Sequence, residues 1–273
     1  MNILAVYAHP DDAEFLASGS MAKWTEEGHQ VYAIAATDGS MGTKTIGLTR
    51  AQVAERRRGE LTRAMEVLGG HEPIGFWFPD GLLSDHCEEL KEKVAFWVRK
   101  LRADRIVTLD PWLSYEIHPD HIAVGRIASE VAVFTCFPLY FPNQIEAGLD
   151  CHQPQEVWYM LPTERAPNRI VDIGGTFEKK VQSILCHRSQ VEMLADWFIP
   201  DADPRNLTED EKQQLDSGVR NLIRTMASGI GQRYDIALAE AFRAVRCGPG
   251  HLDVVGEITT QMLERMSSEV EVH

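Results

Sequence analysis

NILAVYAHPDDAE, residues 2–14, is the stretch of this 273-residue sequence around which the rest is organised. Residues 3–7 form a continuous apolar run rich in β-formers, which is typical of a strand buried on both faces. The tetrad His9-Pro10-Asp11-Asp12 follows where that strand must end, because proline cannot donate to a sheet ladder. Ligands bind at this carboxyl end in open parallel sheets. The tetrad therefore predicts a binding site, and its plainest alternative is a turn in which one Asp caps a helix.

Strand and helix patterns alternate along the chain. We expect strands over residues 3–7, 30–36, 74–78, 105–109, 156–161 and 170–173, and helices over 19–28, 49–69, 88–101, 121–134 and 176–190, with 219–245 mostly helical. Short links between them predict a parallel sheet with right-handed crossovers. The expected fold class is α/β: a three-layer α/β/α Rossmann-like fold with a mostly parallel sheet. We expect one domain, residues 1–273, in which about 190–273 form a mainly helical part packed on the rest.

Composition narrows the classes of partner and location. With 27 basic and 41 acidic residues, the net charge of -14 gives nucleic acid or an anionic membrane no electrostatic attraction, so neither is expected as a partner. The five cysteines are scattered without a C-x-x-C pair, which favours a reducing compartment over a disulfide scaffold. The sequence enters a strand directly, with no basic n-region and no apolar stretch long enough to span a bilayer. We therefore expect a cytoplasmic protein.

Polar residues stand at four predicted strand ends, which meet at one edge of the sheet. They are His9-Pro10-Asp11-Asp12, Asp38, Asp80, and Asp110 with His118-Pro119-Asp120-His121. Histidine and aspartate without cysteine suit Zn²⁺, whose catalytic sites have three protein ligands and an open position, although iron or another divalent ion would also fit. His9 and Asp12 could reach one ion, with His121 as the third ligand. A lone histidine is usually an ordinary surface or core residue, but two His-Pro-Asp tripeptides at one edge favour a metal site.

This assignment leaves Asp11 free beside the metal, as amide hydrolysis requires. Zinc lowers the pKa of its water to about 7, and a neighbouring carboxylate can take the proton during attack, so Asp11 is the expected general base. His118, as an imidazolium, would stabilise the oxyanion and protonate the departing amine. Asp120 would hold a histidine in the right tautomer.

The two motifs together resemble a known family. AHPDDAE near the amino terminus and HPDH in the middle are similar to the motifs of the LmbE-like, or PIG-L, zinc-dependent N-deacetylases, which remove acetyl groups from N-acetylglucosaminyl compounds. The resemblance implies one zinc per subunit, bound by His9, Asp12 and His121. It also implies that Asp11 is the base and His118 the electrostatic or acid partner, which agrees with the roles assigned from chemistry.

Further matches concern the substrate. Arg57, in an R-x-x-E pattern, resembles a family residue that helps to bind substrate, and Asp80 resembles one that takes sugar hydroxyls. The segments TDGSMGT, DPWLSYEIHPDH and HRSQ are most similar to the branch that deacetylates chitin disaccharide and related oligomers. In that branch a histidine near the carboxyl end can reach a neighbouring subunit's site; His251 matches it, with a solvated histidine as the alternative. Trp112 and Tyr115 could stack on sugar faces, or only pack within their loop.

The sequence thus predicts a zinc hydrolase that removes the N-acetyl group from small saccharides such as N,N'-diacetylchitobiose. A deacetylase for N-acetylglucosaminyl-malate or -inositol, or for an antibiotic glycoside, would use the same chemistry with another pocket. A nucleotide-binding Rossmann module is disfavoured because the first turn lacks G-x-G-x-x-G, and a structural metal-binding subunit is a further alternative. The resemblance also implies a homo-oligomer, with a hexamer as one option. Lys180, His187 and Gln190 match another family pattern, and we assign them a structural role.

Overall fold

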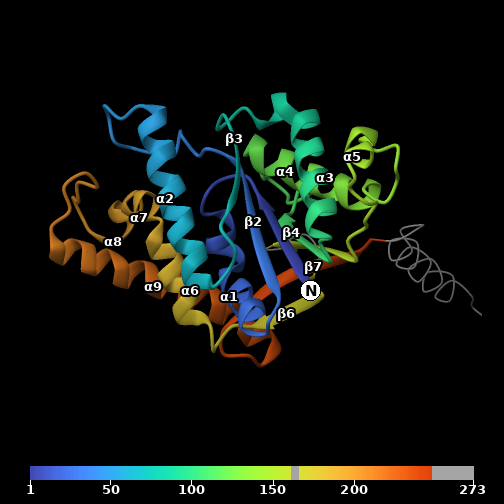
Figure 1. The fold of residues 1–273 in the computed structure, drawn as a ribbon. Helices are drawn as coiled ribbons and strands as arrows, with labels where there is room; N and C mark the ends of the chain where they lie inside the picture. Colours follow the sequence, from blue (N-terminus) through green and yellow to red (C-terminus); the bar gives the residue numbers. More distant parts are fainter. Residues whose placement is uncertain (161–165, 248–273) are drawn as a thin grey trace, which may run out of the picture.

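The computed structural model describes residues 1–160 and 166–247, and β1 (Asn2–Tyr7) is an interior strand of its sheet (Figure 1). All side chains from Ile3 to Tyr7 are fully buried. β1 has parallel neighbours on both sides, β2 (Gln30–Thr37) and β4 (Arg105–Leu109). A strand covered on both faces needs a continuous apolar sequence, which explains the run that predicted it.

Within the described residues, seven strands form one sheet in the order β3-β2-β1-β4-β5-β7-β6. The remaining strands are β3 (Ile74–Phe78), β5 (Glu156–Met160), β7 (Ala239–Arg246) and β6 (Arg169–Asp172). The strands from β3 to β5 in this order are parallel, and β7 runs antiparallel to both of its neighbours. The chain builds the sheet in one direction from β1 through β3 and then returns to β1 with β4. The point between β1 and β4 is therefore the topological switch point, where open α/β sheets bind ligands.

Helices cover both faces of the sheet (Figure 1). One layer holds α1 (Asp12–Glu26), α2 (Arg50–Leu68), α6 (Phe177–Cys186) and α9 (Glu209–Gly231), and the other holds α3 (Cys87–Leu101) and α4 (Pro119–Phe134). The short elements are η1 (Leu83–His86), α5 (Pro142–Glu146), α7 (Arg188–Glu192), α8 (Ala195–Phe198) and η2 (Gln232–Tyr234). The predicted α/β class with a mostly parallel sheet is confirmed. No helix in the described part of the chain combines the length and apolar character that a membrane crossing needs.

Helix ends follow local sequence signals. α2 begins after Thr49, whose hydroxyl accepts from the Gln52 backbone N–H while the Gln52 side chain accepts from the Thr49 backbone N–H. This capping box satisfies two backbone donors that a helix start leaves free. α2 ends at Gly69, whose φ of +73° is the left-handed conformation that glycine adopts without strain.

The expected start of the first helix at residue 19 is wrong, because α1 already begins at Asp12. Its small residues looked unlike a helix, but they allow close packing. A Cβ on Gly19 would lie 2.9 Å from the Ile173 side chain and 3.0 Å from Glu240 Oε1. The Gly19 and Ser20 backbone N–H groups both donate to the Glu240 carboxylate, so glycine lets β7 dock against α1.

Two other expectations are also corrected. Residues 239–246 form β7 inside the sheet, although the sequence predicted helix over 219–245. Pairing with β5 and β6 overrides the helix propensity of this Ala- and Glu-containing segment. The part of the chain after residue 190 therefore contributes a sheet strand as well as helices. The single helix predicted over 176–190 is divided into α6 and α7 at His187, whose backbone is not helical (φ −79°, ψ 57°).

Candidate metal and hydrolytic site

The carboxyl end of β1 delivers His9, Pro10, Asp11 and Asp12 to the switch point. Asp12 begins α1, and its Oδ2 accepts from the His9 backbone N–H at 2.8 Å, which closes the turn. Asp11 lies between them with a φ of +148°, a strained backbone conformation for a residue with a side chain. The turn thus points Asp11 and Asp12 in different directions.

Donor atoms of three residues from the two motifs lie close together. His9 Nδ1 lies 3.5 Å from Asp12 Oδ2, His121 Nε2 lies 3.3 Å from His9 Nδ1, and His121 Nε2 lies 3.5 Å from Asp12 Oδ1. His121 reaches this point from the first turn of α4, because β4 ends beside β1 and the following loop returns to the same edge. The structure therefore brings together the three ligands expected from sequence.

A second group of possible donors lies on the other side of the His9 ring. His9 Nε2 is 3.1 Å from Asp80 Oδ1 and 3.4 Å from Asp120 Oδ2. Both carboxylates already accept backbone N–H groups: Asp80 from Met41, and Asp120 from Gly81 and Leu83. We therefore assign them to the orientation of His9. A carboxylate on the outer nitrogen of a histidine fixes its tautomer and turns the other nitrogen toward a metal.

Asp80 consequently has a different place from the one predicted. It is only 4% exposed, and its two oxygens face His9 and the Met41 backbone N–H. Its part in taking sugar hydroxyls stays a prediction. Asp120, fully buried, lies next to a histidine as expected, and that histidine is His9.

Arg57 makes its hydrogen bonds inside the protein. Its guanidinium donates to Asp11 Oδ1 at 2.6 Å, to the Pro10 carbonyl at 2.9 Å and to the Gly39 carbonyl at 2.9 Å. The residue is 3% exposed. Arg57 therefore holds Asp11 in place, and its part in substrate binding stays a prediction.

His118 caps α4 and stacks on His121 with ring centroids 4.5 Å apart. Its Nδ1 accepts from the Asp120 backbone N–H at 3.3 Å, which leaves the ring proton on Nε2. Burial lowers the pKa of His118, and the positive charge of His9 and His121 lowers it further. Because Nδ1 is used as an acceptor, Nε2 is the ring nitrogen that can donate a hydrogen bond, and the role of His118 as electrostatic or acid partner stays a prediction.

The surrounding carboxylates favour positive charge at the centre. Burial lowers the pKa of His9, but Asp12 and the hydrogen bonds to Asp120 and Asp80 outweigh it and raise the pKa to about 12. Burial raises the pKa of Asp12, but His9 and His121 outweigh it, so that the pKa of this carboxyl lies well below its ordinary value. A group of carboxylates that stabilises positive charge on these histidines is also suited to a divalent cation.

Asp11 responds differently from Asp12. Burial raises its pKa above the ordinary value for aspartate, and the Arg57 guanidinium opposes this effect. A carboxylate with a raised pKa is a stronger proton acceptor, as a general base needs.

Sequence reasoning missed Glu116. Its Oε2 lies 3.0 Å from His121 Nδ1, and its Oε1 accepts from the His118 backbone N–H at 2.8 Å. The available signal was a carboxylate two residues before the HPDH motif, but a five-residue separation from His121 matches no regular helix or strand period.

The other predicted substrate residues are two exposed aromatic side chains and one histidine. Trp112 is 60% exposed, with its ring edge-on to Tyr159 at 5.4 Å, and Tyr115 is 97% exposed. Both belong to the loop between β4 and α4, so they are free to meet a ligand. His251 lies outside the described residues.

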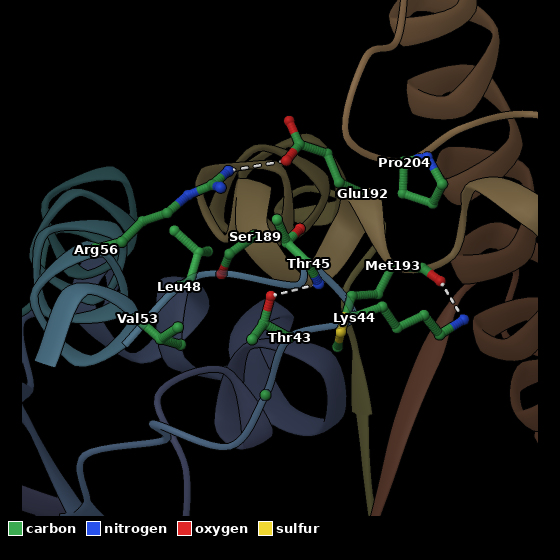
Figure 2. A pocket seen from close by; sticks show the side chains of 11 residues that line it. Thr43, Lys44, Thr45, Leu48, Val53, Arg56, Ser189, Glu192, Met193 and Pro204 are labelled. Carbon is green, nitrogen blue, oxygen red and sulfur yellow. Dashed lines mark hydrogen bonds and ion pairs between the residues drawn. The ribbon is translucent and has the colours of Figure 1, made fainter. Parts of the chain in front are cut away.

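A separate small hollow between α2 and α7 is not a sugar pocket (Figure 2). Its volume of about 20 Å³ is the size of one water. Its polar walls are already paired: Arg56 with Glu192 at 2.9 Å, and the Lys44 ammonium with the Met193 carbonyl at 3.1 Å. This hollow therefore offers no room for a saccharide.

Known proteins resemble the chain in both sequence and structure. The family model for PIG-L, described as GlcNAc-PI de-N-acetylase, matches residues 4–132, which include both histidine–aspartate motifs. The chain is 34% identical over 188 residues to diacetylchitobiose deacetylase of Thermococcus kodakarensis, with 69% of each protein covered. It is 26% identical over 197 residues to a probable N-acetyl-alpha-D-glucosaminyl L-malate deacetylase 2 of Bacillus cereus, with 71% of this chain and 85% of the relative covered. The structure of N,N'-diacetylchitobiose deacetylase from Pyrococcus horikoshii matches with a TM-score of 0.75 and 27% identity, over 89% of this chain and 83% of that one.

Proposed function

Because the chain belongs to the PIG-L, or LmbE-like, deacetylase family, we propose that it is a zinc-dependent hydrolase that removes the N-acetyl group from N-acetylglucosamine-containing saccharides such as N,N'-diacetylchitobiose. One observation carries this proposal: His9, Asp12 and His121 converge on one point, and the carboxylate of Asp11 stands beside them without belonging to the set. Acetate and a free amine would be the products.

The donor set fits zinc. Tetrahedral zinc with bonds of about 2.0–2.1 Å requires ligand atoms about 3.3–3.4 Å apart. Here His9 Nδ1 and His121 Nε2 are 3.3 Å apart, and each lies 3.5 Å from one oxygen of Asp12, Oδ2 for His9 and Oδ1 for His121. His9 and His121 each have a carboxylate at the other ring nitrogen, as metal-binding histidines usually do. When bound, zinc would supply Lewis acidity that polarises an amide carbonyl and lowers the pKa of a water to about 7.

Asp11 would act as the general base. Arg57 holds Oδ1, which leaves Oδ2 to accept the proton of the attacking water. Burial raises the pKa of Asp11, so proton transfer to this carboxylate is more favourable than to an exposed aspartate. The same proton could then pass to the leaving nitrogen, which departs as an amine.

His118 would stabilise negative charge on the carbonyl oxygen. Its Nε2–H is a hydrogen-bond donor held in place before reaction, because Nδ1 is already bonded to the Asp120 backbone N–H. Preorganised donors of this kind contribute strongly to catalysis of acyl transfer. Asp120 would act indirectly, through His9 and through the position of His118.

The experiment that tests this proposal compares wild type, Asp11→Asn and Asp150→Asn. Asparagine keeps the shape of Asp11 and an acceptor for Arg57 but cannot take a proton. We expect Asp11→Asn to retain bound zinc and to release acetate about 10²–10⁴-fold more slowly. Asp150→Asn makes the same chemical change at a side chain that is 90% exposed and should behave as wild type. Wild-type activity in Asp11→Asn would disprove the base assignment.

A second substrate has specific support. The Bacillus cereus relative carries the name of a malate deacetylase, so N-acetylglucosaminyl-malate is the strongest competing substrate. Acetate release from N,N'-diacetylchitobiose, free N-acetylglucosamine, and N-acetylglucosaminyl-malate and -inositol would rank the candidates by kcat/KM. Trp112 and Tyr115 stay predicted sugar contacts, His251 stays a predicted contact from a neighbouring subunit, and the homo-oligomer stays a prediction that light scattering can test.

A further inference from the structure

Glu116 makes two contacts at the edge of the metal site, and the proposed function leaves it without a role. Its Oε2 accepts from His121 Nδ1 at 3.0 Å, and its Oε1 accepts from the His118 backbone N–H at 2.8 Å. The two oxygens of one carboxylate thus connect the ring of one site histidine to the backbone of the other. The Glu116 backbone N–H donates to the Leu113 carbonyl at 3.1 Å, so the backbone of Glu116 is also held within the loop between β4 and α4.

We propose that Glu116 is a positioning residue that fixes the His121 ring for metal binding; this inference rests on the proposed function only in taking His121 as a ligand. With Nδ1–H donated to Glu116, the lone pair of His121 is on Nε2 and points to the position that His9 and Asp12 share. Rotation of the ring by half a turn would break the Glu116 bond and remove Nε2 from that position.

The two site histidines are supported unequally, and this makes Glu116 important. His9 faces two carboxylates, whose side chains are 5% and 0% exposed. Among the described residues, His121 has Glu116 as the carboxylate at Nδ1, and the two side chains are 23% and 21% exposed. The orientation of His121 therefore depends on one half-buried contact, whereas His9 is held by packing and by two carboxylates.

Glu116→Gln and Glu116→Ala separate the contributions of this carboxylate. Glutamine has one acceptor oxygen and one NH₂ group, so it can satisfy His121 Nδ1–H or the His118 backbone N–H but not both. Alanine satisfies neither. We therefore expect zinc affinity to fall in the order wild type, Glu116→Gln, Glu116→Ala, with a total loss of about 10–100-fold.

The test measures the Kd of each purified protein for Zn²⁺ by competition with a chromogenic chelator, without reference to activity. Glu27→Gln is the matched control, because Glu27 is a surface glutamate 3.9 Å from His29 and lies away from the site. It should keep the wild-type Kd.

A Kd for Glu116→Ala within twofold of wild type would overturn the proposal, and so would an equal loss in Glu27→Gln. If Glu116→Ala fails to fold, Glu116→Gln alone decides, since unchanged affinity in that variant is also incompatible with the proposed role. Failure of the proposed function would be seen separately, as wild-type protein that binds zinc tightly but releases no acetate.

Discussion

Replacing Arg57 with methionine should change the pH dependence of hydrolysis and leave substrate binding intact. The guanidinium is 3% exposed and donates to Asp11 Oδ1 at 2.6 Å, with its remaining bonds to the backbone carbonyls of Pro10 and Gly39. Its partner is therefore the expected general base. Methionine fills a similar volume but removes the charge and every donor.

The size of the effect follows from that contact. Burial raises the pKa of Asp11 and Arg57 opposes the rise, so the variant should have an Asp11 pKa still further above the ordinary value. A hydrogen bond to a charged group contributes about 1.5–3 kcal/mol. At about 1.4 kcal/mol for each factor of ten, this corresponds to a loss of about 10- to 150-fold in kcat/KM on the acid side. A base acts only when deprotonated, so the loss should be largest at low pH and should shrink as the pH rises.

The assay is kcat/KM and KM for N,N'-diacetylchitobiose across the acid and neutral range, with wild type, Arg57→Met and Arg57→Lys. Lysine keeps the positive charge without the forked geometry, so its profile should lie between the other two. A raised KM at every pH, with the acid limb of the profile unmoved, would refute this reasoning. That result would restore the substrate-binding role that the sequence suggested.

Four further outcomes are expected. Lys180→Met should lower the free energy of unfolding by about 3–5 kcal/mol in urea titrations, because it leaves Glu240, now 2.7 Å from the ammonium and 4% exposed, as an unpaired buried charge. Gly125→Ala should lower the free energy of unfolding by about 1–3 kcal/mol, since its Cβ would lie 2.5 Å from a backbone carbonyl at the end of β4. Burial lowers the pKa of His187, but Glu14 outweighs this effect, so the net pKa is raised. The stabilisation from this pair should be complete below the unfolded pKa of about 6.5 and should disappear as the pH rises through the folded pKa. It should be absent in His187→Gln when stability is measured against pH. Chelation should abolish acetate release and lower the Tm, and Zn²⁺ at a hundredfold excess over its Kd should restore about 2.7 kcal/mol of stability.

The parallel part of the fold was predictable because each element carries its own signal. β1 is a continuous apolar run, and α2 is bounded by Thr49 with Gln52 and by Gly69. β7 has no such signal. Alanine, glutamate and arginine in residues 239–246 favour a helix, and only the partners β5 and β6 make the segment a strand. Sequence patterns therefore identified the elements that form locally and missed the one that depends on distant pairing.

The same distinction applies to the site. His9, Asp12 and His121 were predicted to meet because strand ends and first helical turns have fixed directions. The contacts of Arg57 with Asp11 and of Asp80 with His9 were not predicted. Direction within a loop or along a long side chain depends on packing, which no local pattern encodes.

The difference between core elements and the exposed loop also explains how relatives with different substrates can share one chemistry. The predicted ligands and base are fixed by β1, α1 and α4, so their geometry depends on the core. Trp112 and Tyr115 are on an exposed loop whose sequence can change without disturbing that core. Glu116 is where the two parts meet, since it belongs to the loop and contacts His121. A change of substrate by loop replacement should therefore preserve metal binding only if a carboxylate remains at this position.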